Sequence, residues 1–104
     1  MAYVGKVSIT STWAKLEDLI KSQVSGQSAF AFDTDKTYSI QTEGTNLPFG
    51  ARFCNSATEP SADDDGEHLT DEQFAVYKPE SGVYLYVKKV RSLGVLKVSV
   101  SENA

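Results

Sequence analysis

The chain is 104 residues long, the size of one domain with a single hydrophobic core. Hydrophobic residues make up 40% of it and charged residues 23%, a composition that excludes a disordered chain. Lys and Arg number 10 and Asp and Glu 14, and the resulting net charge of -4 disfavours binding to the phosphate backbone of nucleic acids.

The N-terminal quarter predicts a strand followed by a helix. From Tyr3 to Ile9, apolar and polar residues alternate with the period of two that is typical of a strand. Apolar residues then recur at helical spacing from about Thr12 to Ser25, and Gly26 stands where a helix would stop. We expect this stripe to pack on a sheet with Trp13 as a core anchor. The stripe consists of Trp13, Leu16, Leu19, Ile20 and Val24.

The middle of the chain predicts a hairpin, a loop and a further strand. Ala29 to Phe32 and Tyr38 to Thr42 are short β-like runs, and the Asp residues between them, in Asp33 to Lys36, readily close a tight turn. Gly, Asn and Pro predict a loop from Glu43 to Gly50, and a strand resumes from Ala51 to Asn55.

The C-terminal half predicts short strands separated by turns. After a loop from Thr58 to Gly66, the expected elements are a strand at Phe74 to Tyr77, a turn at Lys78 to Gly82, and strands at Val83 to Val90 and Val95 to Val100 around Ser92 to Gly94. The run Val83 to Val87 is apolar on both alternating faces, which is typical of a strand that is covered on both sides. In so small a chain, another subunit is one source of the second cover.

About seven strands and one early helix, with no internal repeat or linker, predict a single domain over residues 1–104. We expect an α+β fold that is mainly β. Its architecture would be an antiparallel β-sandwich or an open barrel with one N-terminal amphipathic helix.

The acidic segment after Pro60 has the spacing of a calcium loop. With Ser61 as the first position of an EF-hand loop, oxygen ligands and a turn glycine fall at the expected places. Pro60 stands where an entering helix should end, however, and the sequence before it predicts strand and loop. We therefore expect a solvated acidic loop without metal, and a calcium site is the alternative. The matching positions are Ser61, Asp63, Asp65, Gly66 and Glu72.

Neither the single cysteine nor the single histidine predicts catalysis. Cys54 lies in an expected strand, where a small buried hydrophobe is the usual role, and it has no partner for a disulfide. His68 lies in the expected acidic loop, and no recognisable motif places a Ser or Cys nucleophile for it. We expect no enzyme activity, no cofactor and an exposed histidine held near carboxylates.

Tyr77, Tyr84 and Tyr86 are the candidate binding residues. With Lys88 and Arg91 nearby, their flat rings suit a carbohydrate platform. They suit an oligomer interface as well, and the alternating apolar residues of the same run already supply a core face. The tyrosines are then left as a second face to be covered. We therefore expect an interface, with a carbohydrate- or receptor-binding module as the alternative.

Four short segments, taken in order, resemble small virion proteins of tailed bacteriophages, among them head-decoration, head-fibre and tail-associated subunits. The resemblance implies a non-enzymatic, β-sandwich-like structural module that forms a homo-oligomer or attaches repetitively to other virion proteins. It carries over no catalytic residues. The segments are Trp13 to Ile20, Lys36 to Gln41, Ser56 to Pro60 with Asp65 to Leu69, and Gly82 to Val87.

Localisation follows from what the sequence lacks together with this resemblance. No apolar run approaches the ~20 residues of a membrane span, and the start from Met1 to Lys6 does not have the order of a signal peptide. We expect a protein made in the host cytoplasm and carried on the virion, without membrane or nucleic-acid partners.

Overall fold

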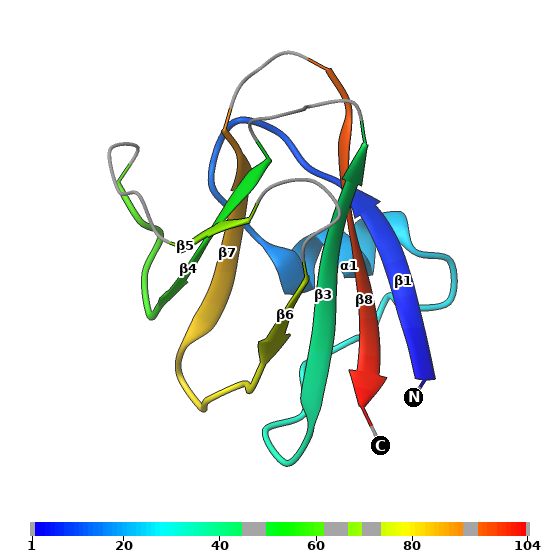
Figure 1. Cartoon of the computed structure of the whole chain (residues 1–104). Helices are drawn as coiled ribbons and strands as arrows, with labels where there is room; N and C mark the ends of the chain where they lie inside the picture. The colour runs from blue at the N-terminus through cyan, green and yellow to red at the C-terminus, as the bar shows by residue number, and fades with distance from the viewer. Residues whose placement is uncertain (1, 45–49, 62–66, 70–73, 91–93, 104) are drawn as a thin grey trace.

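The computed structural model describes residues 2–44, 50–61, 67–69, 74–90 and 94–103. Within these residues the chain forms one short helix and eight strands, which pair in two four-stranded sheets (Figure 1). Every pairing is antiparallel. The fold is therefore mainly β, as expected.

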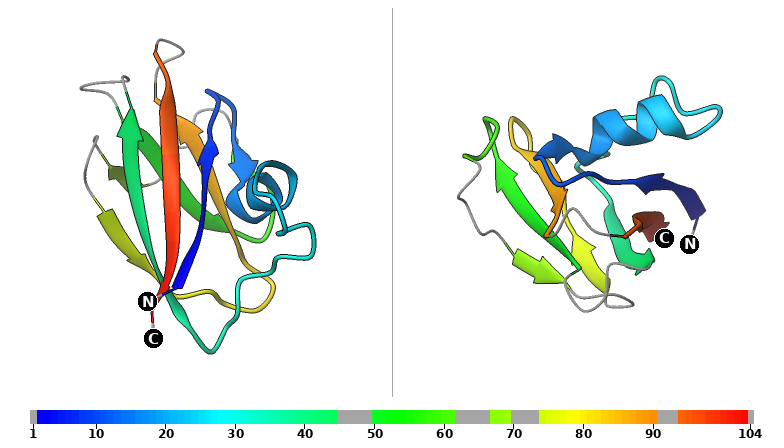
Figure 2. Two further views of the ribbon diagram at one scale, coloured as in Figure 1. Left: turned by 90° about the vertical axis from the view of Figure 1, so that its right-hand side faces the viewer. Right: turned by 90° about the horizontal axis from the view of Figure 1, so that it is seen from above.

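The two sheets differ in the length of their strands. Sheet A has the order β1-β8-β3-β6, in which β1 is Ala2–Ser8, β8 is Leu96–Asn103, β3 is Thr37–Gly44 and β6 is Phe74–Tyr77. Sheet B has the order β2-β7-β4-β5, in which β2 is Ala14–Lys15, β7 is Tyr84–Lys89, β4 is Ala51–Ser56 and β5 is Glu67–Leu69. Figure 2 shows the two sheets facing each other.

One hydrophobic cluster contains residues from both sheets. In β8, Leu96, Val98 and Val100 alternate with more exposed residues, because successive side chains of a strand point to opposite faces. Phe53 and Val87 belong to the same cluster from sheet B. Two sheets with a shared apolar interior are compatible with a β-sandwich.

The helix α1, Leu16–Gln23, lies along one lateral side of the two sheets and contacts β1, β2 and β7 (Figure 2). Its apolar side chains Leu16 and Ile20, one turn apart, are fully buried. Among the described residues, no helix is long and apolar enough to cross a membrane.

The helix is shorter than predicted, and Trp13 lies outside it. Ala14 and Lys15 form β2 and pair with Val87 and Tyr86 of β7, so strand pairing replaces the first turn expected from the apolar spacing. Trp13 is only 7% exposed but does not belong to the core cluster. Trp13 is therefore buried as expected, but it lies outside the cluster that the two sheets share.

The predicted hairpin is also wrong, because Ala29 to Phe32 is not a strand. Backbone N–H groups of this segment donate to side-chain oxygens, and not to the backbone of a neighbouring strand. The N–H of Phe32 donates to Glu17 Oε1 at 3.0 Å, and the N–H of Asp33 donates to Tyr38 Oη at 2.9 Å. The turn from Asp33 to Lys36 is present, with the N–H of Lys36 donating to the Asp33 carbonyl oxygen at 3.1 Å.

The other predicted strands correspond to β1, β3, β4, β6, β7 and β8, with ends shifted by a few residues. Strand β5 was not predicted, because its three residues lie next to the acidic segment that was interpreted as loop. The predicted loops from Glu43 to Gly50, from Thr58 to Gly66 and around Ser92 lie partly outside the described residues.

Side chains from the helical side cover the free edge of β1. The Gln23 side chain bonds to Ser8 twice, accepting from its N–H at 2.8 Å and donating to its carbonyl oxygen at 2.9 Å. Gln27 Nε2 donates to the carbonyl oxygen of Val4 at 3.3 Å. These bonds occupy backbone groups that another strand would need for pairing.

Gly5 allows the chain after α1 to approach β1 closely. A Cβ atom at this position would lie 2.6 and 2.8 Å from the two methyl groups of Val24. We expect Gly5→Ala to lower the free energy of unfolding by about 1–3 kcal/mol through overpacking. In a chain that already carries Val24→Ala, Gly5→Ala should lower the free energy of unfolding clearly less, as measured by urea denaturation. An equal decrease with and without Val24→Ala would contradict this account.

Leu16 should be among the residues most sensitive to truncation, because it is fully buried. We expect Leu16→Ala to lower the free energy of unfolding by about 2–5 kcal/mol through cavity formation. Leu19→Ala is a matched control on the same helix, since Leu19 is only partly buried. A melting temperature that fell equally in both variants would argue against the assigned packing.

Candidate binding sites

The three predicted interface tyrosines do not share one face. Tyr84 and Tyr86 are two residues apart on β7 and lie on the outer face of sheet B. Tyr77 lies on sheet A opposite Tyr38, and both of these rings belong to the core cluster. Tyr84 is 37% exposed, whereas Tyr86 and Tyr77 are 4% and 7% exposed. Of the three, Tyr84 alone offers an accessible ring.

At Tyr86, the outer face of β7 is covered by the chain itself and not by another subunit. This residue lies between Lys15 of β2 and Cys54 of β4 and is buried without another subunit. Lys15 Nζ lies 3.8 Å from the centroid of the Tyr84 ring, a cation–π distance. The apolar character of both strand faces therefore does not require a neighbouring copy at this position.

Trp13 connects the outer face of sheet B to the segment after β4. Its Nε1–H donates to the carbonyl oxygen of Ser61 at 2.9 Å, and Lys88 Nζ lies 4.7 Å from the centroid of its ring. Arg91, which was predicted to accompany Lys88, lies outside the described residues. A cavity of about 320 Å³ lies here, lined by Ser11, Thr12, Trp13, Glu59, Pro60 and Lys88.

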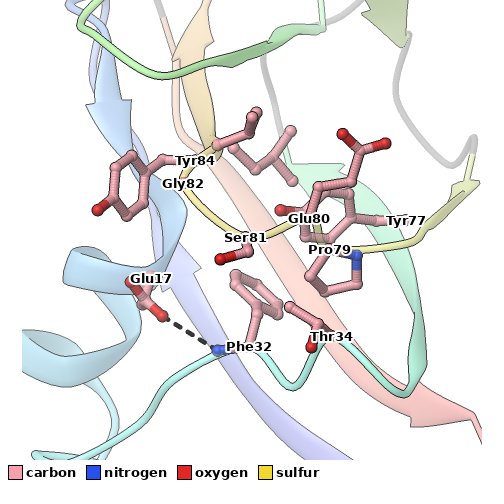
Figure 3. A pocket seen from close by; sticks show the side chains of 11 residues that line it. Glu17, Phe32, Thr34, Tyr77, Pro79, Glu80, Ser81, Gly82 and Tyr84 are labelled. Carbon is pink, nitrogen blue, oxygen red and sulfur yellow. Dashed lines mark hydrogen bonds between the residues drawn. The ribbon is translucent and has the colours of Figure 1, made fainter.

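A second, smaller cavity of about 160 Å³ opens between α1 and the turn that joins β6 to β7 (Figure 3). Helix α1 contributes Glu17, the segment before β3 contributes Phe32 and Thr34, and β6 contributes Tyr77. Figure 3 shows Glu17 on one side, Tyr77 and Pro79 on the other, and Phe32 between them. The remaining lining residues are Glu80, Ser81, Gly82, Val83, Tyr84 and Leu85.

Phe32 is fixed from several directions. Its ring meets the rings of Phe30, Tyr38 and Tyr77 edge-on at centroid distances of 5.0, 4.8 and 5.1 Å. Edge-to-face contacts of this kind are favourable beyond the area they bury. The hydrogen bond from the Phe32 N–H to Glu17 Oε1 holds the same segment to the helix. The pocket therefore has a preformed aromatic base.

Burial raises the pKa of the Tyr77 phenol to about 12, with further contributions from the carboxylates of Glu17 and Glu80 and from Tyr38. The phenol is therefore neutral throughout the physiological range. Among the described residues, the Tyr77 hydroxyl has no hydrogen-bond partner, although its ring points into the pocket (Figure 3). Sequence reasoning found Tyr77 but did not single out Glu17, and it placed Phe32 in a strand.

The candidate metal loop lies largely outside the described residues. This applies to Asp63, Asp65, Gly66 and Glu72, so the prediction of a solvated loop without metal stays a prediction. Within the part of the chain that is described, no group of three or more His, Cys, Asp or Glu side chains could hold a metal ion.

The lone histidine and cysteine lie on neighbouring strands of sheet B. His68 belongs to β5, opposite Arg52 of β4, and not to a loop as predicted. Cys54 is a free thiol and is half-buried, where full burial was expected. Its side chain lies on the outer face with Tyr86, while that of Phe53 points to the core.

Comparison with known proteins adds no further constraint. No family model, no curated protein and no solved structure matches the chain. The functional argument therefore depends on the contacts of this chain itself.

The raised pKa of Tyr77 predicts a loss of stability in strong base. The folded chain keeps this proton up to about pH 12, whereas a group with the ordinary pKa of 10.0 has already lost it. The free energy of unfolding should therefore fall between pH 10 and 12. In the Tyr77→Phe variant, the free energy of unfolding measured by urea denaturation should fall less steeply with pH across this range. Identical slopes for the variant and the wild-type chain would contradict the assignment.

Proposed function

We propose that the chain is a non-enzymatic structural component of a bacteriophage virion, a capsid-decoration, head-fibre or tail-associated subunit. In this proposal a β-sandwich module associates with copies of itself and attaches to a neighbouring virion protein, without a cofactor. The context comes from the resemblance of its sequence segments to such subunits. The mode of action is supported by one structural observation, the difference between the two edges of sheet A.

Side chains bond to the β1 edge, whereas no described strand pairs with the free side of β6. Gln23 and Gln27 bond to the backbone of β1, whereas β6 pairs with β3 alone among the described strands. The sequence of β6 is Phe-Ala-Val-Tyr, without a charge or a proline. Native proteins usually protect an edge strand with such residues, so their absence favours strand addition.

The outer face of sheet A is suited to close approach by a neighbouring protein. Tyr3, Ser101, Ser39 and Val76 follow one another across β1, β8, β3 and β6 in the strand register. The two central residues, both serines, are small. At the two ends of the row, Tyr3 is 64% exposed and Val76 is 63% exposed. Apolar side chains at both ends of a small polar row provide two anchors on one surface.

The alternative function is a carbohydrate- or receptor-binding module. It is favoured by the exposed Tyr84 ring, which Lys15 approaches on the outer face of sheet B. Flat aromatic rings cover the apolar faces of sugars, and nearby charged groups can bind their hydroxyls. This surface is on the other sheet from the β6 edge, so the two functions can be tested separately.

Introducing a charge at the β6 edge should weaken self-association. We expect Val76→Lys to lower the weight-average mass of the chain measured by sedimentation equilibrium. Its circular dichroism spectrum should stay unchanged. Val95→Lys is the matched control, because Val95 is another exposed valine, at 54%, and lies outside the strands. A wild-type chain that remains monomeric at high concentration, alone and with purified virions, would contradict the proposal.

The same preparations distinguish the alternative. Antibody labelling of purified particles should place the chain on the head or the tail if it is a virion subunit. Saturable binding on a glycan array that is lost in Tyr84→Ser, without any particle labelling, would favour the carbohydrate-binding module.

A further inference from the structure

The hydrogen bonds between β1 and β8 fix the direction of every backbone group in sheet A. In an antiparallel pair of strands, residues that bond to each other alternate with residues that do not. Ile9 lies opposite Leu96 when the β1–β8 register is continued by one step, and its N–H donates to the carbonyl oxygen of Leu96 at 3.1 Å. This is therefore a bonded pair, and the same alternation makes Val7 and Val98 the next bonded pair.

The alternation continues across the sheet to β6. Residues of β8 that lie between those bonded to β1 direct their backbone groups to β3, which makes Ser99 and Gln41 a bonded pair. Their neighbour Ile40 therefore bonds to β6, where it lies opposite Ala75. It follows that Val76, next to Ala75, directs its N–H and C=O away from the sheet.

The β1 edge provides an independent check of this assignment. By the same alternation, Ser8 directs its backbone groups away from β8, and both groups bond to the Gln23 side chain at 2.8 and 2.9 Å. The chain thus supplies a partner for the outward groups at this position. Within the part of the chain that is described, no hydrogen bond reaches the outward N–H or C=O of Val76.

The composition of β6 suits pairing with an identical strand. Two copies of a strand bring like charges together wherever a charged residue lies at the contact, and such pairs are destabilising. Strand β6, Phe-Ala-Val-Tyr, carries no charge. The Val76 side chain is 63% exposed, so an adjacent strand would remove part of it from water.

We propose that β6 pairs antiparallel with β6 of a second copy through the outward backbone groups of Phe74 and Val76. This inference rests on the proposed function, because it assigns the contact by which copies associate. A two-fold axis perpendicular to the sheet makes the two identical strands antiparallel, as in every other strand pair of the chain. Each N–H of one copy then faces a carbonyl oxygen of the other.

The contact is short, so association in solution should be weak. Strand β6 has four residues, and each backbone bond contributes little because it replaces bonds to water. We expect a dissociation constant on the order of 0.1 mM. Attachment of several copies to one particle raises their local concentration, which makes a weak contact sufficient there.

The test is amide hydrogen exchange of the full chain, followed by nuclear magnetic resonance at about 20 µM and at about 1 mM. The N–H of Val76 should exchange about fourfold more slowly at the higher concentration, which is the decrease in the monomer fraction for this dissociation constant. Lys6 is the matched control, because the alternation directs its N–H outward on β1. Its exchange rate should be the same at both concentrations.

Each other outcome overturns the inference in a recognisable way. Association with an unchanged rate at Val76 would place the contact elsewhere and leave the proposed function standing. Slowing at Lys6 in place of Val76 would assign the contact to the β1 edge. Slowing at Val76 only after purified virions are added would show that a strand of a different protein occupies the edge. A chain that is monomeric alone and with virions would contradict the proposed function itself.

Proline variants separate backbone pairing from side-chain packing. Val76→Pro removes an outward N–H, a change that edge strands tolerate, and should weaken association by about tenfold while the circular dichroism spectrum stays unchanged. Ala75→Pro removes an N–H that bonds to β3 and should instead lower the melting temperature. Val76→Thr keeps the backbone groups and nearly the same shape, so it should change the dissociation constant by less than about threefold.

An equal loss of association in Val76→Thr and Val76→Pro would show that the side chain makes the contact, and would overturn the proposed backbone pairing. The exchange rates of the wild-type chain decide the question even if Val76→Pro does not fold.

Discussion

Leu16 and Ile20 of α1 are fully buried, and the helix that carries them contacts β1 of sheet A and β7 of sheet B. Burial of a leucine or isoleucine contributes roughly 1.5–3 kcal/mol each, a large share of a small domain's stability. This contact also positions the Gln23 side chain at β1 and the Glu17 carboxylate at Phe32. The occupied edge and the aromatic pocket both depend on where this helix lies.

The strands were predictable where one face is buried and the other is exposed. In β1 and β8 the period of two is set by alternate contact with core and solvent, and it is visible in the residues themselves. The start of the helix was not predictable, because Trp13 continues the helical spacing of the apolar stripe, whereas Ala14 and Lys15 after it pair with β7. Pairing between distant segments decided this conformation over local preference.

The candidate pocket was predictable only as separate residues. Tyr77 was identified by its type, but its partners Glu17 and Phe32 lie 60 and 45 positions earlier in the printed sequence. Nothing local marks Phe32, whose apolar neighbours predicted a strand until the backbone bonds to Glu17 and Tyr38 gave it another role. Conversely, Tyr86 was expected to need an external cover because the pattern cannot show that Lys15 and Cys54 would lie beside it.

The unequal edges of sheet A limit the symmetry that edge pairing can produce. A sheet with two open edges can add copies head to tail without end and form a fibre. Here Gln23 and Gln27 bond to the β1 edge, so the proposed edge pairing between copies would join β6 of one copy to β6 of another. Such a contact is two-fold and uses the open edge of both copies. Under this proposal, growth of sheet A by edge pairing would stop at a closed pair.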